Sequence, residues 1–271
     1  MSAPSSLPAA LFRRAASDPE EPWLFRSEGW DWPWQPWGEI ARRVSFWAER
    51  LSDLSPGTRV AFADLPRPEI LILDLAVQAA GLVAVPARSE EDLDGCRIWA
   101  DLELDPDSGA PAGLERLRLP EFDASGAGAS VAPARPAGGV VARREGRAVE
   151  LSQPDLIALA DLVQQEIPPP AKPVREIVVA GRSLGDFEDR AVLAWATVTG
   201  AAVLLPSTPE SRVAAAAWAR VTIFHGTEAE AAALRAAMGK GSRFRRLRAV
   251  LTAGGMSKVG VLPQSGVNRG I

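Results

Sequence analysis

The hydrophobic pattern of residues 55–87 predicts a strand, a helix and a second strand in succession. Arg59–Phe62 is a short apolar run, and an apolar segment then extends from Pro68 to Gly81. Proline at the first helical position and glycine just past the last one are typical helix boundaries. Val83–Val85 follows as a second apolar run. Two such strands joined by a helix form a parallel crossover unit, whose strands are buried on both faces.

The same alternation continues in the second half of the chain. Residues 140–151 form two alternating runs around Glu145-Gly146, which predicts a hairpin, and Ser152 with Asp155 predicts the start of a helix. The pattern then predicts four strands, at 175–180, 202–205, 221–224 and 247–252, separated by helices at 186–199, 209–218 and 227–238. This order indicates an α/β fold with parallel sheets flanked by helices on both faces.

The N-terminal region predicts a helix over 7–17, a strand over 23–25 and an amphipathic helix over 37–54. Between the strand and the second helix lies a tryptophan cluster, Trp30, Trp32, Trp34 and Trp37. The first three alternate, so in a strand they would share one face. The cluster is either a platform for a ligand or partner, or an apolar lid between a hairpin and the next helix; the hypothesis of a lid is favoured.

The amino-acid composition excludes several classes of function for this chain. The chain has 271 residues, 47% of them hydrophobic, and a net charge of −4, so nothing indicates nucleic-acid binding. A single cysteine, Cys96, excludes an internal disulfide, and a single histidine, His225, leaves too few ligands for an ordinary zinc site. No secretory signal or membrane-spanning run is apparent, so we expect a cytoplasmic protein.

We expect four regions. Residues 1–104 form a first α/β subdomain with the N-terminal helix and hairpin, and residues 105–137, rich in Pro, Gly, Ala and Asp, form a linker or long loop with a possible short element at 114–119. Residues 138–255 form a second α/β subdomain, and residues 256–271 an irregular tail.

Four segments carry a family resemblance: PGTRVAFADLPRPEILILDLAVQAAGLVAVP, GDFEDRAVLAWATVTGAAVLLP, VTIFHGTEAEAAALRAA and LRAVLTAGG. In this order they resemble the N-terminal portion of the AMP-forming acyl-CoA synthetase and adenylation-domain superfamily. The resemblance covers residues 7–255 and implies two α/β subdomains, with Trp30–Trp32 as the return strand of an N-terminal hairpin.

The resemblance also implies where a nucleotide would bind. In that superfamily a Ser/Thr/Gly-rich loop with a lysine holds the ATP phosphates. The matching residues here read APARPAGGV, which keep Gly138 and Gly139 but lack the hydroxyls and the lysine. Arg135 is the one cation left in this segment, and it either faces a phosphate or is simply solvated. Gly254 and Gly255 match the turn that borders the adenine pocket, or form an ordinary strand-end turn.

His225 matches a position near the acyl pocket of the superfamily, and the alternative is a structural histidine. Ser183 has neither a nucleophile-elbow motif nor a histidine partner near it in the sequence. The superfamily glutamate that helps to hold magnesium lies in a tyrosine-containing motif, and this chain contains no tyrosine. We therefore expect no catalytic residue and no metal ligand.

The superfamily activates a carboxylate with ATP as an acyl-adenylate and transfers the acyl group to a thiol. We expect this chain to be a catalytically degenerate relative that acts without a cofactor as a binding or structural module, with a protein partner or a second copy. The alternative is a split or noncanonical ligase that binds ATP or AMP with magnesium and needs a partner for the missing half. A third possibility is a truncated gene product without function.

Overall fold

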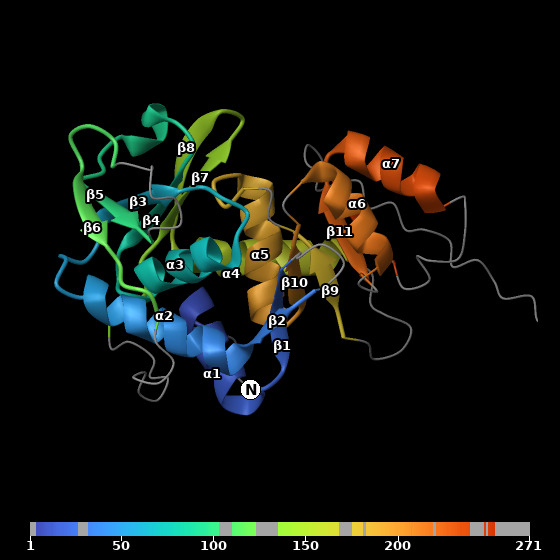
Figure 1. Ribbon diagram of the computed structural model, residues 1–271, viewed down its shortest axis with the longest axis horizontal. Coiled ribbons are helices and arrows are strands. Elements are labelled where there is room, and N and C mark those ends of the chain that lie inside the picture. Colours follow the sequence, from blue (N-terminus) through green and yellow to red (C-terminus); the bar gives the residue numbers. More distant parts are fainter. Residues whose placement is uncertain are drawn as a thin grey trace, which may run out of the picture.

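A computed structural model describes residues 4–26, 32–102, 110–122, 135–167, 175–180, 183–206, 208–218, 221–238, 247 and 249–252. Within this part, the chain forms two six-stranded sheets, and α-helices pack between them and on one outer side (Figure 1). The α/β architecture expected from the hydrophobic pattern is confirmed.

The first sheet, sheet I, has the strand order β12-β11-β9-β10-β1-β2. Its strands are β1 (Pro22–Arg26), β2 (Trp34–Pro36), β9 (Ile177–Val179), β10 (Ala202–Leu205), β11 (Ile223–Gly226) and β12 (Ala249–Thr252). All neighbours are parallel except the edge strand β2, which runs antiparallel to β1.

The second sheet, sheet II, has the order β6-β5-β3-β4-β7-β8. Its strands are β3 (Arg59–Ala63), β4 (Val83–Ala87), β5 (Ile98–Asp101), β6 (Glu115–Arg118), β7 (Val140–Arg144) and β8 (Arg147–Leu151). Again the only antiparallel neighbour is an edge strand, β8, which pairs with β7. The two sheets therefore share one topology, in which β3 corresponds to β9, β4 to β10 and the hairpin β7–β8 to β1–β2.

The helices form two groups. One central core is shared by the inner faces of both sheets and by helices α1 (Leu7–Ser17), α2 (Trp37–Leu51), α3 (Pro68–Ala79), α4 (Gln153–Glu166) and α5 (Phe187–Thr199). Helices α6 (Pro209–Trp218) and α7 (Glu228–Met238) cover the outer face of sheet I. Among the described residues, the outer face of sheet II is covered by the 3-10 turn η1 (Glu90–Leu93) and by the loop at 110–114.

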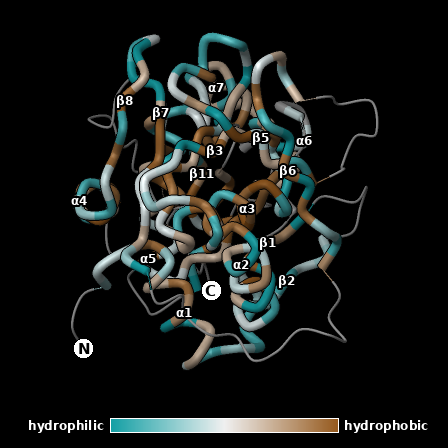
Figure 2. Tube along the Cα trace, turned by 90° about the vertical axis from the view of Figure 1, so that its left-hand side faces the viewer, coloured by the Kyte–Doolittle hydropathy of each residue, from teal (hydrophilic) through white to brown (hydrophobic). Residues whose placement is uncertain are grey.

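Burial alternates along the strands as the pleat requires. In β3, Val60 and Phe62 belong to the central core, whereas Ala61 faces the outer side. In β9, Val178 and Val179 divide in the same way between the inner and outer cores. Figure 2 shows the hydrophobic residues gathered in the strands and in α3, with hydrophilic residues at the periphery.

Helix α3 is buried on nearly all sides, yet it carries two polar side chains. Asp74 is 1% exposed and accepts two hydrogen bonds from Arg190 of α5, at 2.6 and 3.0 Å. Gln78 donates to Asp74 at 2.7 Å and accepts from Gln153 of α4 at 2.8 Å. Gln153 in turn accepts from the Leu7 backbone N–H at 2.8 Å. Buried polar groups need partners, and here these bonds connect four helices between the two sheets.

Most of the expected elements are present with small changes at their ends. The expected helix over 7–17 has those bounds, and Ser152 with Asp155 forms a capping box at the start of α4. β6 lies within the expected short element at 114–119. The expected tail, 256–271, lies outside the described residues.

The hairpin differs from the expectation. Trp30 lies outside the described residues, and the return strand is Trp34–Pro36 rather than Trp30–Trp32. The reason is the hairpin closure: the Arg26 N–H donates to the Pro33 carbonyl at 3.0 Å, so strand pairing begins at Trp34 opposite Phe25.

The sheets also cross the boundaries expected at residues 104 and 138. The N-terminal hairpin β1–β2 joins the strands of the second half, and the hairpin β7–β8 joins those of the first half. Each half of the chain therefore contributes its hairpin to the other half's sheet. Within the described part of the chain, no helix combines the length and the apolar character needed to cross a membrane.

Candidate functional site

Sheet I has a topological switch point at β9, because β10 lies on one side of it and β11 on the other. In open α/β sheets, ligands bind outside the carboxyl ends of the strands at such a point. Ser183 follows β9, and His225 lies near the end of β11. This edge is therefore the candidate site.

His225 is held by its neighbours on both its ring and its backbone. Its Nδ1 lies 2.8 Å from Oδ1 of Asp189 in the first turn of α5, and both side chains are almost completely buried. Asp189 also accepts the Ser183 backbone N–H at 3.1 Å. Arg212 of α6 donates to the His225 carbonyl. The ring thus ties β11 to α5 and is only 2% exposed.

The carboxyl end of sheet II meets the same segment. Asp64, which directly follows β3, accepts the Ser183 hydroxyl at 2.5 Å and the Leu184 and Gly185 backbone N–H groups at 2.8 and 3.3 Å. Burial raises the pKa of Asp64, although these three donors and the nearby Arg88 oppose the shift. One carboxylate therefore connects the ends of the two sheets.

The mouth of this junction is lined by paired charges. Arg88, which follows β4, is half-exposed and donates to Asp186 at 2.7 Å, with Asp64 3.6 Å away. Arg143 of β7 pairs with Asp92 of η1. In the part of the chain that the structure describes, no group of three His, Cys, Asp or Glu side chains is arranged to hold a metal ion.

The structure places Gly138 and Gly139 at the opposite end of β7 from this junction. The Gly138 N–H donates to the Gln78 carbonyl at 2.8 Å, and the Gly139 carbonyl accepts from Ala84 at 3.0 Å. A Cβ on Gly138 would overlap with the Leu82 backbone, and one on Gly139 would lie 2.7 Å from the Leu151 carbonyl oxygen. These glycines allow close packing of backbones.

Arg135 and the second glycine pair complete the nucleotide candidates. The Arg135 guanidinium donates to the Leu54 carbonyl at 2.9 Å, just beyond α2. Gly254 and Gly255 lie outside the described residues. A nucleotide role for the four glycines stays a prediction, and the structure does not bring Gly138 and Gly139 together with His225.

The tryptophans named as interface candidates have separate environments. Trp37 is 1% exposed and stacks on Trp23, with ring centroids 4.2 Å apart. Trp32 is partly buried against the outer core of sheet I, and Trp34 is 48% exposed. Trp37 is thus part of the central core, and Trp34 is the cluster member with a large exposed area among those described.

Two buried acids were missed by the sequence reasoning. Asp64 directly follows a strand of the central crossover, and strand ends are where the sites of α/β folds form, so this position could have been found from the sequence. Asp74 interrupts an otherwise apolar helix, and a charge in such a position needs a buried partner. That partner is Arg190, which lies more than a hundred residues away in the sequence. No local sequence signal identifies it.

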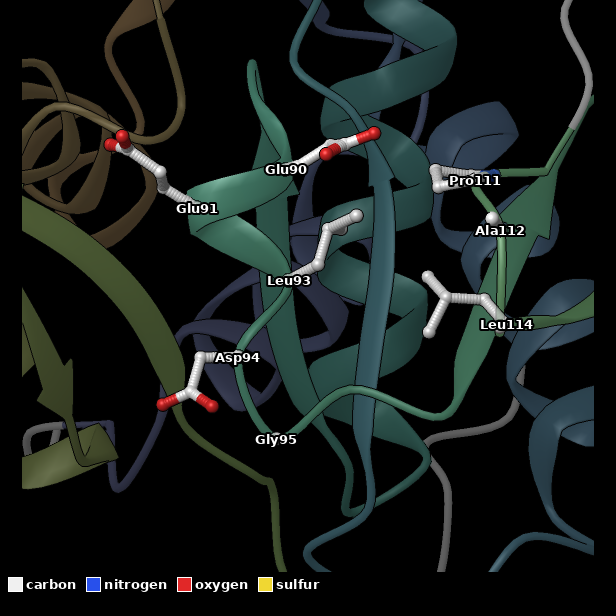
Figure 3. A pocket seen from close by; sticks show the side chains of 9 residues that line it. Glu90, Glu91, Leu93, Asp94, Gly95, Pro111, Ala112 and Leu114 are labelled. Atoms are coloured by element: carbon white, nitrogen blue, oxygen red, sulfur yellow. The ribbon is translucent and has the colours of Figure 1, made fainter.

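A surface hollow of about 480 Å³ lies away from this junction, between η1 and the segment Pro111–Leu114. Figure 3 shows Leu93 and Leu114 pointing from opposite walls toward its middle. Glu90, Glu91 and Asp94 also line it. The hollow therefore has apolar walls, formed by Leu93 and Leu114, and acidic residues at its edge.

Comparisons with known proteins show the fold. No protein-family profile matches the sequence, and no curated protein matches it either. Among solved structures, the AMPPNP-bound nonribosomal peptide synthetase FmoA3 is similar with a TM-score of 0.73 and 19% identity, over 93% of this chain and 29% of that one.

Two further solved structures are similar to this chain in fold. The fused adenylation–PCP di-domain NpsA-ThdA from Klebsiella oxytoca gives a TM-score of 0.72 and 17% identity, over 94% of this chain and 48% of that one. The Mycobacterium tuberculosis fatty acyl CoA synthetase gives 0.64 and 14%, over 85% and 51%. The chain therefore has the fold of part of an adenylation or acyl-CoA synthetase domain, and it spans about half or less of these proteins' lengths.

Proposed function

We propose that the chain is a catalytically degenerate member of the AMP-dependent synthetase and ligase superfamily that acts as a binding or structural interaction module in a larger assembly. The fold supports the superfamily. The observation that carries the loss of catalysis is the internal use of the segment that matches the phosphate loop.

That segment offers a nucleotide little to bind. A phosphate cradle needs backbone N–H groups and side-chain donors that point at the ligand. Here the Gly138 N–H is directed to Gln78 and the Arg135 guanidinium to Leu54. Gln153 also donates to the Gly138 carbonyl at 2.5 Å. These donors serve the packing of α2, α3 and α4 against β7.

The candidate site supports the same proposal. His225 and Asp189 are paired and buried, and the Asp64 carboxylate already accepts hydrogen bonds from Ser183 and Leu184. Arg88 and Asp186 neutralise each other at the mouth. The junction therefore stabilises the contact between the two sheets, and no described side chain in it is left poised for acyl activation.

The test is a thermal-shift titration of the purified chain with ATP–magnesium and with a nonhydrolysable acyl-adenylate analogue. We expect no shift with either ligand. A ligand at 100 times its Kd stabilises the native state by about 2.7 kcal/mol, which raises Tm by several degrees in a domain of this size. A saturable rise would overturn the proposal, and an active adenylation domain serves as the positive control.

The alternative function is that of a split ligase, whose second part is supplied by a separate chain. It is favoured by the fold, which is similar to that of adenylation and acyl-CoA synthetase domains. It predicts release of pyrophosphate from ATP when such a partner and a carboxylate are supplied. Absence of pyrophosphate release under those conditions counts against it.

A further inference from the structure

The shared topology of the two sheets allows their outer faces to be compared directly. In sheet I, the connections β10–β11 and β11–β12 contain helices α6 and α7. These helices pack on the outward residues of the strands, Val179, Leu204, Phe224 and Val250. A helical layer is thus the element that covers this face.

Sheet II has shorter connections at the corresponding places. The β4–β5 connection, residues 88–97, contains only the single turn η1. In the β5–β6 connection, the described residues, 102 and 110–114, contain no helix. The outward residues Ala61, Val83, Val85, Ala87 and Trp99 form a smaller core here, against partly buried side chains that include Leu93 and Leu114.

The hollow of about 480 Å³ lies beside η1, among the loop residues that cover this face. Leu93 and Leu114 point into it from its two walls, and Pro111 and Ala112 continue the wall beside Leu114 (Figure 3). Half-buried leucines facing one another across an open hollow are suited to contact an apolar side chain from outside.

The acidic residues at the edge of the hollow indicate the charge of a partner that would bind there. Glu90, Glu91 and Asp94 line the hollow, and within the described residues neither Glu90 nor Glu91 forms an ion pair. In Figure 3, Glu90 extends in the direction of Pro111, while Glu91 and Asp94 point to the other side of η1. Complementary potentials across an interface favour association with a basic partner.

We propose that the outer face of sheet II, at the hollow between η1 and Pro111–Leu114, binds a basic amphipathic helix of a partner protein. The helix lies on η1 and the segment Pro111–Leu114, which themselves cover the outward residues of sheet II: its apolar side chains contact Leu93 and Leu114, and its lysines or arginines face Glu90. This inference rests on the proposed function, because it names the surface through which the interaction module acts.

The probe is a synthetic helix-forming peptide with leucine at positions i, i+3, i+4 and i+7 and lysine on its other face. Binding to the full chain is measured by fluorescence anisotropy, with a matched peptide that carries glutamate in place of lysine. We expect saturable binding of the lysine peptide, weakened by salt, and binding of the glutamate peptide that is at least about tenfold weaker.

Variants of the chain locate the binding. We expect E90Q/E91Q to weaken binding about tenfold and Leu114→Asn to weaken it about 30-fold, as for a central apolar contact. D161N/E166Q on the exposed side of α4 is the matched charge control and leaves binding unchanged. Leu114→Met, which keeps an apolar side chain of similar volume, retains binding, and circular dichroism melts confirm that each variant folds.

Three results would overturn the proposal: no saturable binding, equal binding to E90Q/E91Q and to the control, or a dimer of the chain that E90Q/E91Q dissociates. The last result assigns the face to a second copy. The nucleotide titration is a separate readout, so a shift with ATP would remove the proposed function without affecting the peptide result. Failure of peptide binding alone leaves the loss of catalysis standing.

Discussion

The buried pair Asp74–Arg190 provides the strongest test of how the two halves are held together. Both side chains are 1% exposed, and the guanidinium donates to both carboxylate oxygens. Removal of one member of a buried ion pair leaves the other charge without compensation, which costs about 3–5 kcal/mol. We therefore expect Arg190→Met and Asp74→Leu each to lower the free energy of unfolding by this amount.

The double variant D74L/R190M tests whether the loss of stability in the single variants comes from the unpaired charge or from the change of a buried side chain. Replacement of both charges by apolar side chains of similar volume is often neutral or stabilising. In the double variant, the Gln78 side chain loses the hydrogen-bond acceptor that lies 2.7 Å away, which destabilises the protein by about 1–3 kcal/mol. We expect the double variant to be more stable than either single variant, so the coupling energy exceeds the cost of a single variant and is above about 3 kcal/mol.

The assay is urea unfolding, followed both by tryptophan fluorescence and by far-ultraviolet circular dichroism. Coincident transitions show that one cooperative unit unfolds. Trp195, which lies on α5 one turn beyond Arg190, reports on the region. If each single variant costs less than about 1 kcal/mol, or if the two effects simply add, the pair is not the buried connection described above.

Three further predictions concern single positions. Burial raises the pKa of Asp64, so its contribution to stability is present below the unfolded value of about 3.9 and is lost as pH rises through the folded value. In urea unfolding, the advantage of wild type over Asp64→Asn should therefore shrink as pH rises above about 4, and an unchanged difference contradicts this. Gly138→Ala should destabilise by about 1–3 kcal/mol through overlap with the Leu82 backbone, measured by the same assay. Trp37→Ala should cost about 3–5 kcal/mol because it empties a fully buried ring site against Trp23, whereas Trp34→Ala, at an exposed ring, should change Tm little.

The sequence predicts local structure well because its signals are local. Period-2 and period-3.6 apolar patterns and the Ser152 cap place nearly all helices and strands. It could not predict that the hairpins β1–β2 and β7–β8 exchange sheets, because both partners are distant in the sequence. Leu24 of β1 pairs with Val203, 179 residues further along, and Val140 of β7 pairs with Ala84, 56 residues earlier, each in a parallel arrangement. The expected subdomain boundaries followed chain order, and the sheets do not.

The candidate site was predictable only in part, for the same reason. His225 follows the strand predicted at 221–224, but its pairing with Asp189 depends on the packing of α5 against β11, which has no local signal. Gly138 and Gly139 were singled out for nucleotide binding from their resemblance to a loop. Their contacts with Gln78 and Ala84 show a packing role that a motif does not reveal.

The two proposals share one structural basis: the central core lies between the two sheets and is separate from their outer layers. Helices α1–α5 and the inner faces of both sheets form one cluster, which the outer layers do not enter. Stability therefore resides between the sheets, where Asp74, Arg190, Gln78 and Gln153 also pair. Gly138 and Arg135 add to this packing through the Gln78 and Leu54 carbonyls, so the segment that resembles the phosphate loop supports the same core.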